Sequence, residues 1–154
     1  MAYASSEARR QLLDAVAEAT DRIGVALGTL GAAYEQLDEY SADRLEEQLF
    51  RPVQAAYGRA KRTHSGFAER SGLATRAFTS ADDAAVGPSR GVTTLIEAAT
   101  DAAGEADTIL AGLQDSMLPV EVGDAELRAG LSAVREQLGD LRARARAFTR
   151  GLGR

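Results

Sequence analysis

His64 is the residue whose side chain is best suited to chemistry, and it is the only histidine among the 154 residues. A neutral imidazole acts as a general base or a metal ligand, but it needs an orienting partner, a substrate pocket or further ligands. The chain has no Glu-x-x-His motif, whereas helical bundles that bind two iron ions carry two such motifs and additional inward carboxylates. His64 also lies on the apolar side of a predicted helix, and Gly66 nearby allows another chain segment to approach. We therefore expect a structural histidine, hydrogen-bonded to a backbone carbonyl or a nearby hydroxyl.

Carboxylates at four-residue spacing can bind a divalent cation, as they do in PhoU-like helical bundles. Two such ridges are present: Glu97, Asp101 and Glu105 on one predicted helix, and Asp14, Glu18 and Asp21 on another. Both ridges point away from the apolar side of their helices. We interpret them as solvated faces or as partners of arginine side chains, and we predict no bound metal and no cofactor.

Arginines recur along the last predicted helix in two rows. The first row is Arg128, Arg135 and Arg142, and the second is Arg142, Arg146 and Arg150. Guanidinium rows can bind phosphate or an acidic partner. The formal net charge of −5 and the lack of interleaved aromatic residues argue against nucleic acid as that partner. We expect these arginines to pair with carboxylates of the same chain.

The elements that position these side chains are predicted from hydrophobic periodicity. Apolar residues recur in alternating steps of three and four over residues 13–37, 50–71, 92–117 and 127–152. A 3.5-residue repeat places each series on one side of a helix, as in a coiled coil, and no stretch alternates with the period of two that a strand requires. Short first and third connections require antiparallel neighbours. The sequence thus predicts an all-α fold: an antiparallel up-down-up-down four-helix bundle with heptad-like core stripes, formed by a single domain, residues 1–154.

Two segments interrupt this pattern. Pro52 lacks a backbone N–H and disfavours helical backbone at the preceding residue, and the apolar phase shifts there. We therefore predict a kink or a break near Pro52, with a short helix from about Ala42 to Phe50 before it. The long connection at residues 72–91 is expected to cross over and pack on the bundle, with Phe78 closing one end.

The stretch IGVALGTLGAAY, residues 23–34, carries no charge on any side of its helix. A helix surface without charge for three turns is usually covered, and its glycines let another helix approach closely. The cover is either another subunit or the neighbouring helices of the same chain. The outward positions of this stretch are our candidates for contact with a partner chain: Val25, Gly28, Thr29 and Ala32.

The leading functional hypothesis is a non-enzymatic bundle that acts through its surfaces, as a homo-oligomer or as a module that binds another helical protein. The alternative is a small-molecule- or metal-binding bundle, catalytic or not, in which His64, Tyr57 and Thr20 line a cavity. A further alternative is association with type VII secretion. Tyr34 and Asp38 resemble the Tyr-x-x-x-Asp/Glu signal of its substrates, although the chain lacks the Trp-x-Gly turn of that family.

The composition of the chain indicates its cellular compartment and excludes some classes of partner. Without cysteine the chain forms no disulfide and no thiolate site, which fits a reducing compartment. The N-terminal residues carry charges where a secretion signal needs an apolar segment. The uncharged run at residues 23–34 is 12 residues long and too short to span a membrane. We expect a cytoplasmic protein with neither a membrane span nor a nucleic-acid partner.

Overall fold

The computed structural model describes residues 2–80 and 90–152, with side chains from Ser6 onward. Within these ranges all regular structure is helical, as the periodicity predicts. The elements are α1 (Ala2–Glu35), α2 (Glu39–Leu45), the π-helical turn η1 (Glu46–Phe50), α3 (Arg51–Arg70), α4 (Val92–Asp115), α5 (Leu118–Val122), α6 (Ala125–Leu138) and α7 (Leu141–Leu152). None of the described helices is long and apolar enough to cross a membrane.

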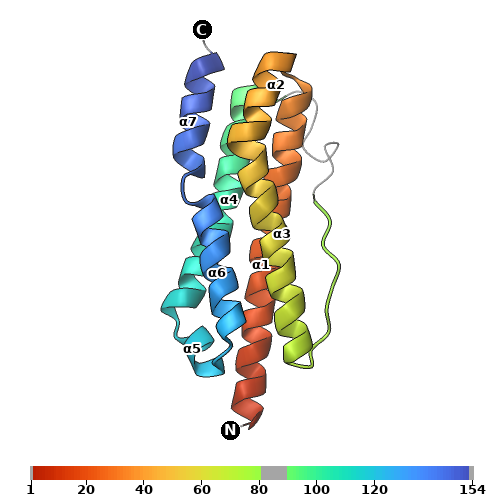
Figure 1. Ribbon diagram of the computed structural model, residues 1–154, viewed down its shortest axis with the longest axis vertical. Coiled ribbons are helices and arrows are strands. Elements are labelled where there is room, and N and C mark those ends of the chain that lie inside the picture. The colour runs from red at the N-terminus through yellow and green to blue at the C-terminus, as the bar shows by residue number, and fades with distance from the viewer. Residues whose placement is uncertain (1, 81–89, 153–154) are drawn as a thin grey trace.

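The long helices lie side by side along one axis, and the two chain ends lie at opposite ends of the molecule (Figure 1). α1 packs against α3 and α4, and α6 packs against the same two helices. Two contacts fix the directions. The side chain of Gln36, just after α1, donates to the carbonyl of Arg90, just before α4, at 2.9 Å. Arg70 at the end of α3 binds Glu126 at the start of α6 at 2.6 Å. Adjacent helices are therefore antiparallel.

The order of helix directions differs from the predicted up-down-up-down order. α3 and α4 run in the same direction, because Arg90 just before α4 lies beside Gln36, at the opposite end of the molecule from the end of α3 (Figure 1). The described part of the connection between them, residues 71–80, runs beside α1 and α3, where Arg76 pairs with Asp21 and Phe78 packs on His64. The result is a single long crossover, which is one of the known connections of helical bundles. Phe78 covers a side of the molecule and does not close its end as predicted.

Of the two outcomes predicted at Pro52, the break does not occur, and the kink stays a prediction. Helical backbone continues from Glu39 to Arg70, and the irregularity is the wider turn η1 just before the proline. In η1 the N–H of Arg51 donates to the carbonyl of Glu46, five residues back. Because Pro52 has no N–H and its ring crowds the carbonyl four residues back, a regular α-helix is unfavourable there. The wider turn accommodates the proline without ending the helix.

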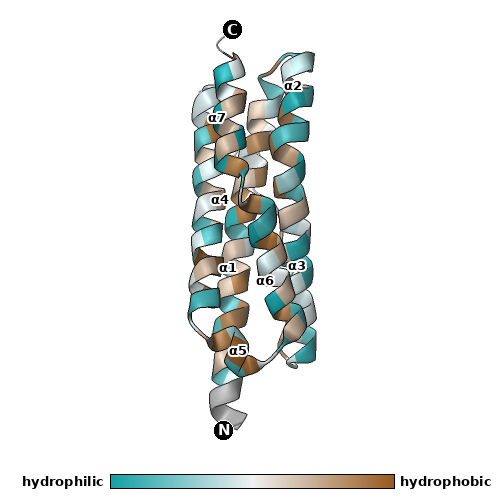
Figure 2. Cartoon of the chain, turned by 60° about the vertical axis from the view of Figure 1, so that its left-hand side comes forward, coloured by the Kyte–Doolittle hydropathy of each residue, from teal (hydrophilic) through white to brown (hydrophobic). Residues whose placement is uncertain are grey.

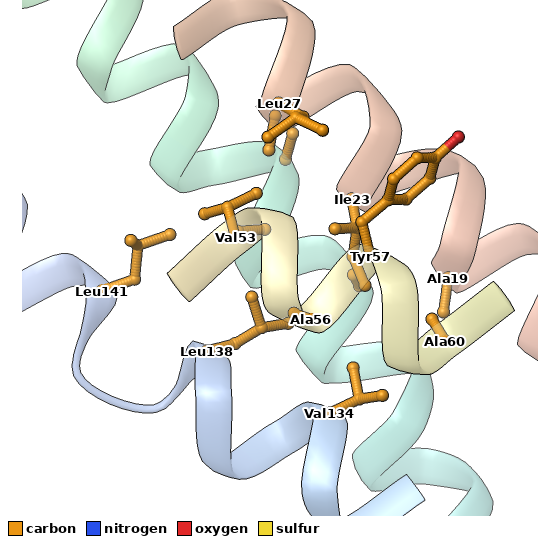
Figure 3. Packing of buried hydrophobic residues seen from close by; sticks show 14 of the residues in the cluster. Ala19, Ile23, Leu27, Val53, Ala56, Tyr57, Ala60, Val134, Leu138 and Leu141 are labelled. Carbon is orange, nitrogen blue, oxygen red and sulfur yellow. The ribbon is translucent and has the colours of Figure 1, made fainter. Parts of the chain in front are cut away.

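One buried cluster of apolar side chains contains residues from all four predicted stripes. Figure 3 shows Ile23 and Leu27 of α1 near Val53 of α3, with Leu138 of α6 on the other side of α3. Hydrophilic and hydrophobic residues alternate along each long helix (Figure 2). Two stripe positions differ from the prediction: Tyr34 and Met117 are exposed, because they lie at the ends of α1 and α4.

Candidate functional site

The surface between α3 and α6 contains two adjoining recesses of about 370 and 260 Å³. Arg59 and Arg62 line both recesses, so the two form one continuous surface, which we call the α3/α6 groove. Small residues contribute to its lining and leave space above them: Ala55, Gly58, Ala129 and Ala133. Beneath the groove the two helices approach closely, because Gly130 of α6 lies directly against the side chain of Thr63.

The charge of the groove comes from α3. Arg51, Arg59 and Arg62 are separated by eight and three residues, which places them on one side of the helix. Within the described part of the chain, none of the three side chains forms an ion pair or a hydrogen bond. Arg62 folds over Gly58, since a Cβ atom at this glycine would lie 3.3 Å from Nη1 of Arg62. Three guanidinium groups at this surface are therefore open to an anionic group.

Arg70, at one end of the groove, connects α3 with α6. Its guanidinium donates to both carboxylate oxygens of Asp124 at 2.8 Å and to Glu126 at 2.6 Å. The hydrogen bond from Arg70 is the main reason that the pKa of Asp124 lies below its usual value. Asp124 also accepts a hydrogen bond from the N–H of Leu127 at 2.9 Å and caps α6. Arg70 therefore has a structural role that the other three arginines lack.

The side chains of the groove are suited to binding and not to proton transfer. A guanidinium group stays protonated and presents a planar set of donors that matches a carboxylate or a phosphate. Gln54 and Gln137 add neutral amide groups to the same surface. Such donors beside small side chains can accommodate the acidic side of a helix.

No family model, curated protein or solved structure matches this chain. The functional inference therefore rests on the chemistry of the molecule's own surfaces. The motif that resembles a type VII signal is divided between two elements: Tyr34 lies in the last turn of α1, and Asp38 lies beyond its end. The carboxylate of Asp38 accepts a hydrogen bond from the N–H of Ser41 at 2.7 Å, and this bond, which caps α2, lowers its pKa.

The three residues predicted to line a common cavity are all buried, and a cavity shared by them stays a prediction. His64 is 3% exposed and borders a surface recess beside α1, whereas Tyr57 and Thr20 do not line that recess. The hydroxyl of Thr20 donates to the carbonyl of Val16 at 2.7 Å. In the described chain, Nδ1 of His64 and the hydroxyl of Tyr57 are buried without a hydrogen-bond partner. The predicted burial of His64 is confirmed, but the predicted hydrogen bond is absent at Nδ1.

The partner-contact candidates on α1 do not form one open surface. Gly28 and Thr29 are buried within the single chain, Ala32 is half-buried and Val25 is 41% exposed. The crossover covers α1 one turn before Gly28, since a Cβ atom at Gly24 would lie 3.5 Å from the backbone of Ser80 in the crossover. The same chain therefore provides part of the cover that the uncharged stretch requires. Contact of these four residues with a partner chain stays a prediction.

The acidic ridges and the arginines of the last helix meet other charged residues in ion pairs between helices. The pairs are Arg142–Asp101 at 3.4 Å, Arg135–Asp107 at 2.9 Å and Arg22–Glu105 at 3.4 Å. Pairing of arginines with carboxylates of the same chain is thus confirmed for these residues. Across residues 2–80 and 90–152, no group of three acidic or histidine side chains is placed to hold a metal ion.

The arginines of α3 were not predicted as site residues, although the sequence contains a signal for them. Arg59 and Arg62 have no carboxylate three or four positions away on their own helix, so neither has an acidic neighbour on the same face. The regular arginine rows of the last helix are the more visible pattern, and two of their members, Arg135 and Arg142, form ion pairs between helices.

Proposed function

We propose that this chain is a single-domain four-helix bundle with one crossover, and that it works without catalysis as a protein-binding module. The α3/α6 groove is the binding surface, and the partner is a protein that presents the acidic side of a helix. Carboxylates of the partner pair with Arg59 and Arg62, while its small side chains lie over Gly58 and Ala133.

The observation that supports this proposal is unpaired positive charge collected on one helix of an acidic chain. The whole chain has a formal net charge of −5. Residues 51–70 contain five basic residues and one acidic residue. Arg70 is paired with α6, so the unpaired charge in the groove belongs to Arg51, Arg59 and Arg62. Like charges that lie together repel one another, and an acidic group bound between them relieves that repulsion. A surface of this kind favours association with an acidic partner and makes that association sensitive to salt.

The first test uses a designed acidic helix as the probe, a fluorescent peptide of roughly 18 residues, or about five turns, with Glu on one side and Ala on the other. Fluorescence anisotropy should show binding that weakens as NaCl is raised from about 50 to about 300 mM. The double variant Arg59→Glu/Arg62→Glu should lose this binding. The matched control is Arg144→Glu/Arg150→Glu on α7, which changes the net charge equally and should bind as the wild type does. Equal loss in both variants, or no binding to the wild type, would contradict the proposal.

The second test identifies the natural partner. A photo-crosslinking amino acid at Ala133 in the groove is compared with one at the exposed Ala143 on α7. We expect a crosslinked protein with an acidic helix at Ala133 only, and we expect it to disappear in the Arg59→Glu/Arg62→Glu variant. Light scattering on the purified protein then shows whether this partner is a second copy of the chain. A crosslinking pattern that does not depend on the two arginines would count against the groove.

A further inference from the structure

The helix that carries the groove arginines begins well before the groove. α2, η1 and α3 form one continuous helix from Glu39 to Arg70, which we call the α2–α3 helix (Figure 1). Four residues slightly exceed an α-helical turn of about 3.6 residues, and the wider turn η1 offsets the resulting drift. Exposed residues four positions apart therefore follow one outward side of this helix, and the last two of them line the groove: Glu39, Asp43, Glu47, Arg51 and Ala55.

The charge of this outward side changes sign along the helix. Before the groove it carries the carboxylates of Glu39, Asp43 and Glu47, and at the groove it carries the three unpaired arginines. Within the described part of the chain, none of these carboxylates forms an ion pair. Arg44, the one basic residue of α2 and η1, lies over the ring of Phe148 instead. Two sets of unpaired, opposite charge thus lie one after the other on the same side.

A second copy of the α2–α3 helix, laid antiparallel on the first, brings these opposite charges together. With Glu47 of one copy opposite Arg59 of the other, Asp43 comes to lie near Arg62, because four residues rise about 6 Å along a helix and three rise about 4.5 Å. A two-fold axis forms the same two pairs again with the copies exchanged. A parallel arrangement in the same register would place like charges opposite each other.

The residues in the middle of such a contact are small or neutral. Gln54, Ala55 and Gly58 lie between the two charged sets and line the groove, and Ala133 of α6 lines it beside them. A glycine leaves room for another backbone to approach closely. In the antiparallel register, Arg51 faces Ala55 of the second copy, so no like charge lies directly opposite its guanidinium. The outward side of this one helix is therefore complementary to itself.

We propose that the acidic helix bound by the α3/α6 groove belongs to a second copy of this chain, and that the α2–α3 helices of the two copies pack antiparallel across a two-fold axis. This inference rests on the proposed function and names its partner. Asp43 and Glu47 of each copy pair with Arg62 and Arg59 of the other. A two-fold contact requires a surface that supplies both partners of every pair, and complementary charge favours such association at low salt.

The test is sedimentation equilibrium of the purified chain in about 50 mM NaCl. The wild type should form a dimer with a Kd of about 100 μM or below, and about 300 mM NaCl should weaken it about tenfold or more. Arg59→Glu/Arg62→Glu and Asp43→Lys/Glu47→Lys each place like charges opposite each other in both halves of the contact. Each variant alone should therefore be monomeric.

Mixing these two variants should restore a dimer. The lysines of one variant then face the glutamates of the other, while the second half of the contact keeps the natural pairs. The matched control is Glu97→Lys/Glu121→Lys, which changes the net charge as Asp43→Lys/Glu47→Lys does, at exposed carboxylates of α4 and α5. The control should dimerise as the wild type does and should leave Arg59→Glu/Arg62→Glu monomeric. Circular dichroism should show that all variants keep their helical content.

Three results would overturn the inference: a wild type that is monomeric at about 1 mM, a dimer that persists in both variants, or a mixture of the two that stays monomeric. The proposed function is tested separately with the acidic peptide, which should bind the monomeric Asp43→Lys/Glu47→Lys variant because its groove arginines are intact. Peptide binding together with a monomeric wild type contradicts only the second copy as partner. A peptide that does not bind this variant contradicts the groove itself.

Discussion

The imidazole of His64 lies beneath the crossover, where its ring meets that of Phe78 edge-on with centroids 4.9 Å apart. Burial first, and the Arg76 guanidinium second, lower the pKa of His64 from its ordinary 6.5, whereas Asp14 and Asp21 act in the opposite direction. The folded protein therefore favours the neutral ring. Protonation of His64 is linked to the packing of α1, α3 and the crossover around it.

We predict that acidification below about pH 7 destabilises the protein through His64. Between the lowered pKa of the folded state and 6.5, the unfolded chain binds a proton that the folded chain does not, so the free energy of unfolding falls as pH decreases. One proton limits this slope to about 1.4 kcal/mol per pH unit. Urea unfolding at about pH 7.5 and 5.5 measures the change.

His64→Phe is the control for this pH dependence, because the chain has no other histidine. Its free energy of unfolding should change much less over the same interval. Asp38 and Asp124, whose pKa values are lowered from the ordinary 3.8, affect stability only at lower pH. An equal slope in wild type and variant would show that His64 is not responsible.

Gly130 sets the distance between α6 and α3. A Cβ atom at this position would overlap the side chain of Thr63, whose hydroxyl donates to the carbonyl of Arg59 at 2.8 Å. We predict that Gly130→Ala lowers the free energy of unfolding by about 1–3 kcal/mol, as overpacking does. Gly112→Ala on α4 is the matched control: its Cβ would meet nothing within 4 Å, so it should stabilise by about 0.5–1 kcal/mol. Denaturant unfolding of both variants measures the difference, and a similar effect of the two substitutions would refute the close approach.

The turn between α4 and α5 contains a strained residue. Met117 has φ 67°, in the left-handed region, and its side chain is 55% exposed. For residues other than glycine this conformation costs roughly 1–2 kcal/mol, and glycine is common at this position after a helix. We predict that Met117→Gly raises the free energy of unfolding by about 0.5–1 kcal/mol. Met117→Ala keeps the backbone cost and should change it by less than about 0.5 kcal/mol. Thermal unfolding measures both, and equal stabilisation by Ala and Gly would attribute the effect to the exposed side chain.

The helices illustrate what sequence periodicity can and cannot predict. Leu27, Tyr57, Leu110 and Leu138 are all buried, since a 3.5-residue repeat reliably identifies the packed side of a helix. Pro52 correctly marks an irregular place, but its missing N–H does not reveal whether the helix breaks or widens. The wider turn η1 depends on the neighbouring helices, because η1 packs against α1 and α7 as well as α3.

The direction of α4 could not be predicted from the sequence, because the connection before it is long. A connection of about 20 residues can span roughly 60 Å when extended, which exceeds the roughly 36 Å of a 24-residue helix such as α4. The connection therefore reaches either end of the molecule, and its composition does not choose between them. For the same reason, the candidate sites could not be predicted from the sequence. The α3/α6 groove and the recess at His64 both combine residues from elements whose adjacency follows from the direction of the helices.

The arrangement of the whole molecule yields the last prediction. The chain has no cysteine, so two introduced cysteines can carry a pair of spin labels without other changes. Gln36 and Arg90 lie in hydrogen-bond contact just before α2, whereas Glu69 lies at the far end of α3. Between them run α2, η1 and α3, and α3 alone has 20 residues, or about 30 Å. Labels at 36 and 90 should therefore be separated by less than about 20 Å, and labels at 69 and 90 by about 30 Å or more. An up-down-up-down bundle would reverse both results, because the start of α4 would then follow the end of α3 directly. A third pair of labels, at Glu69 and Ala125, tests the direction of α6. The distance between these labels should be short, because α6 begins beside the end of α3. In an up-down-up-down bundle this distance would be long.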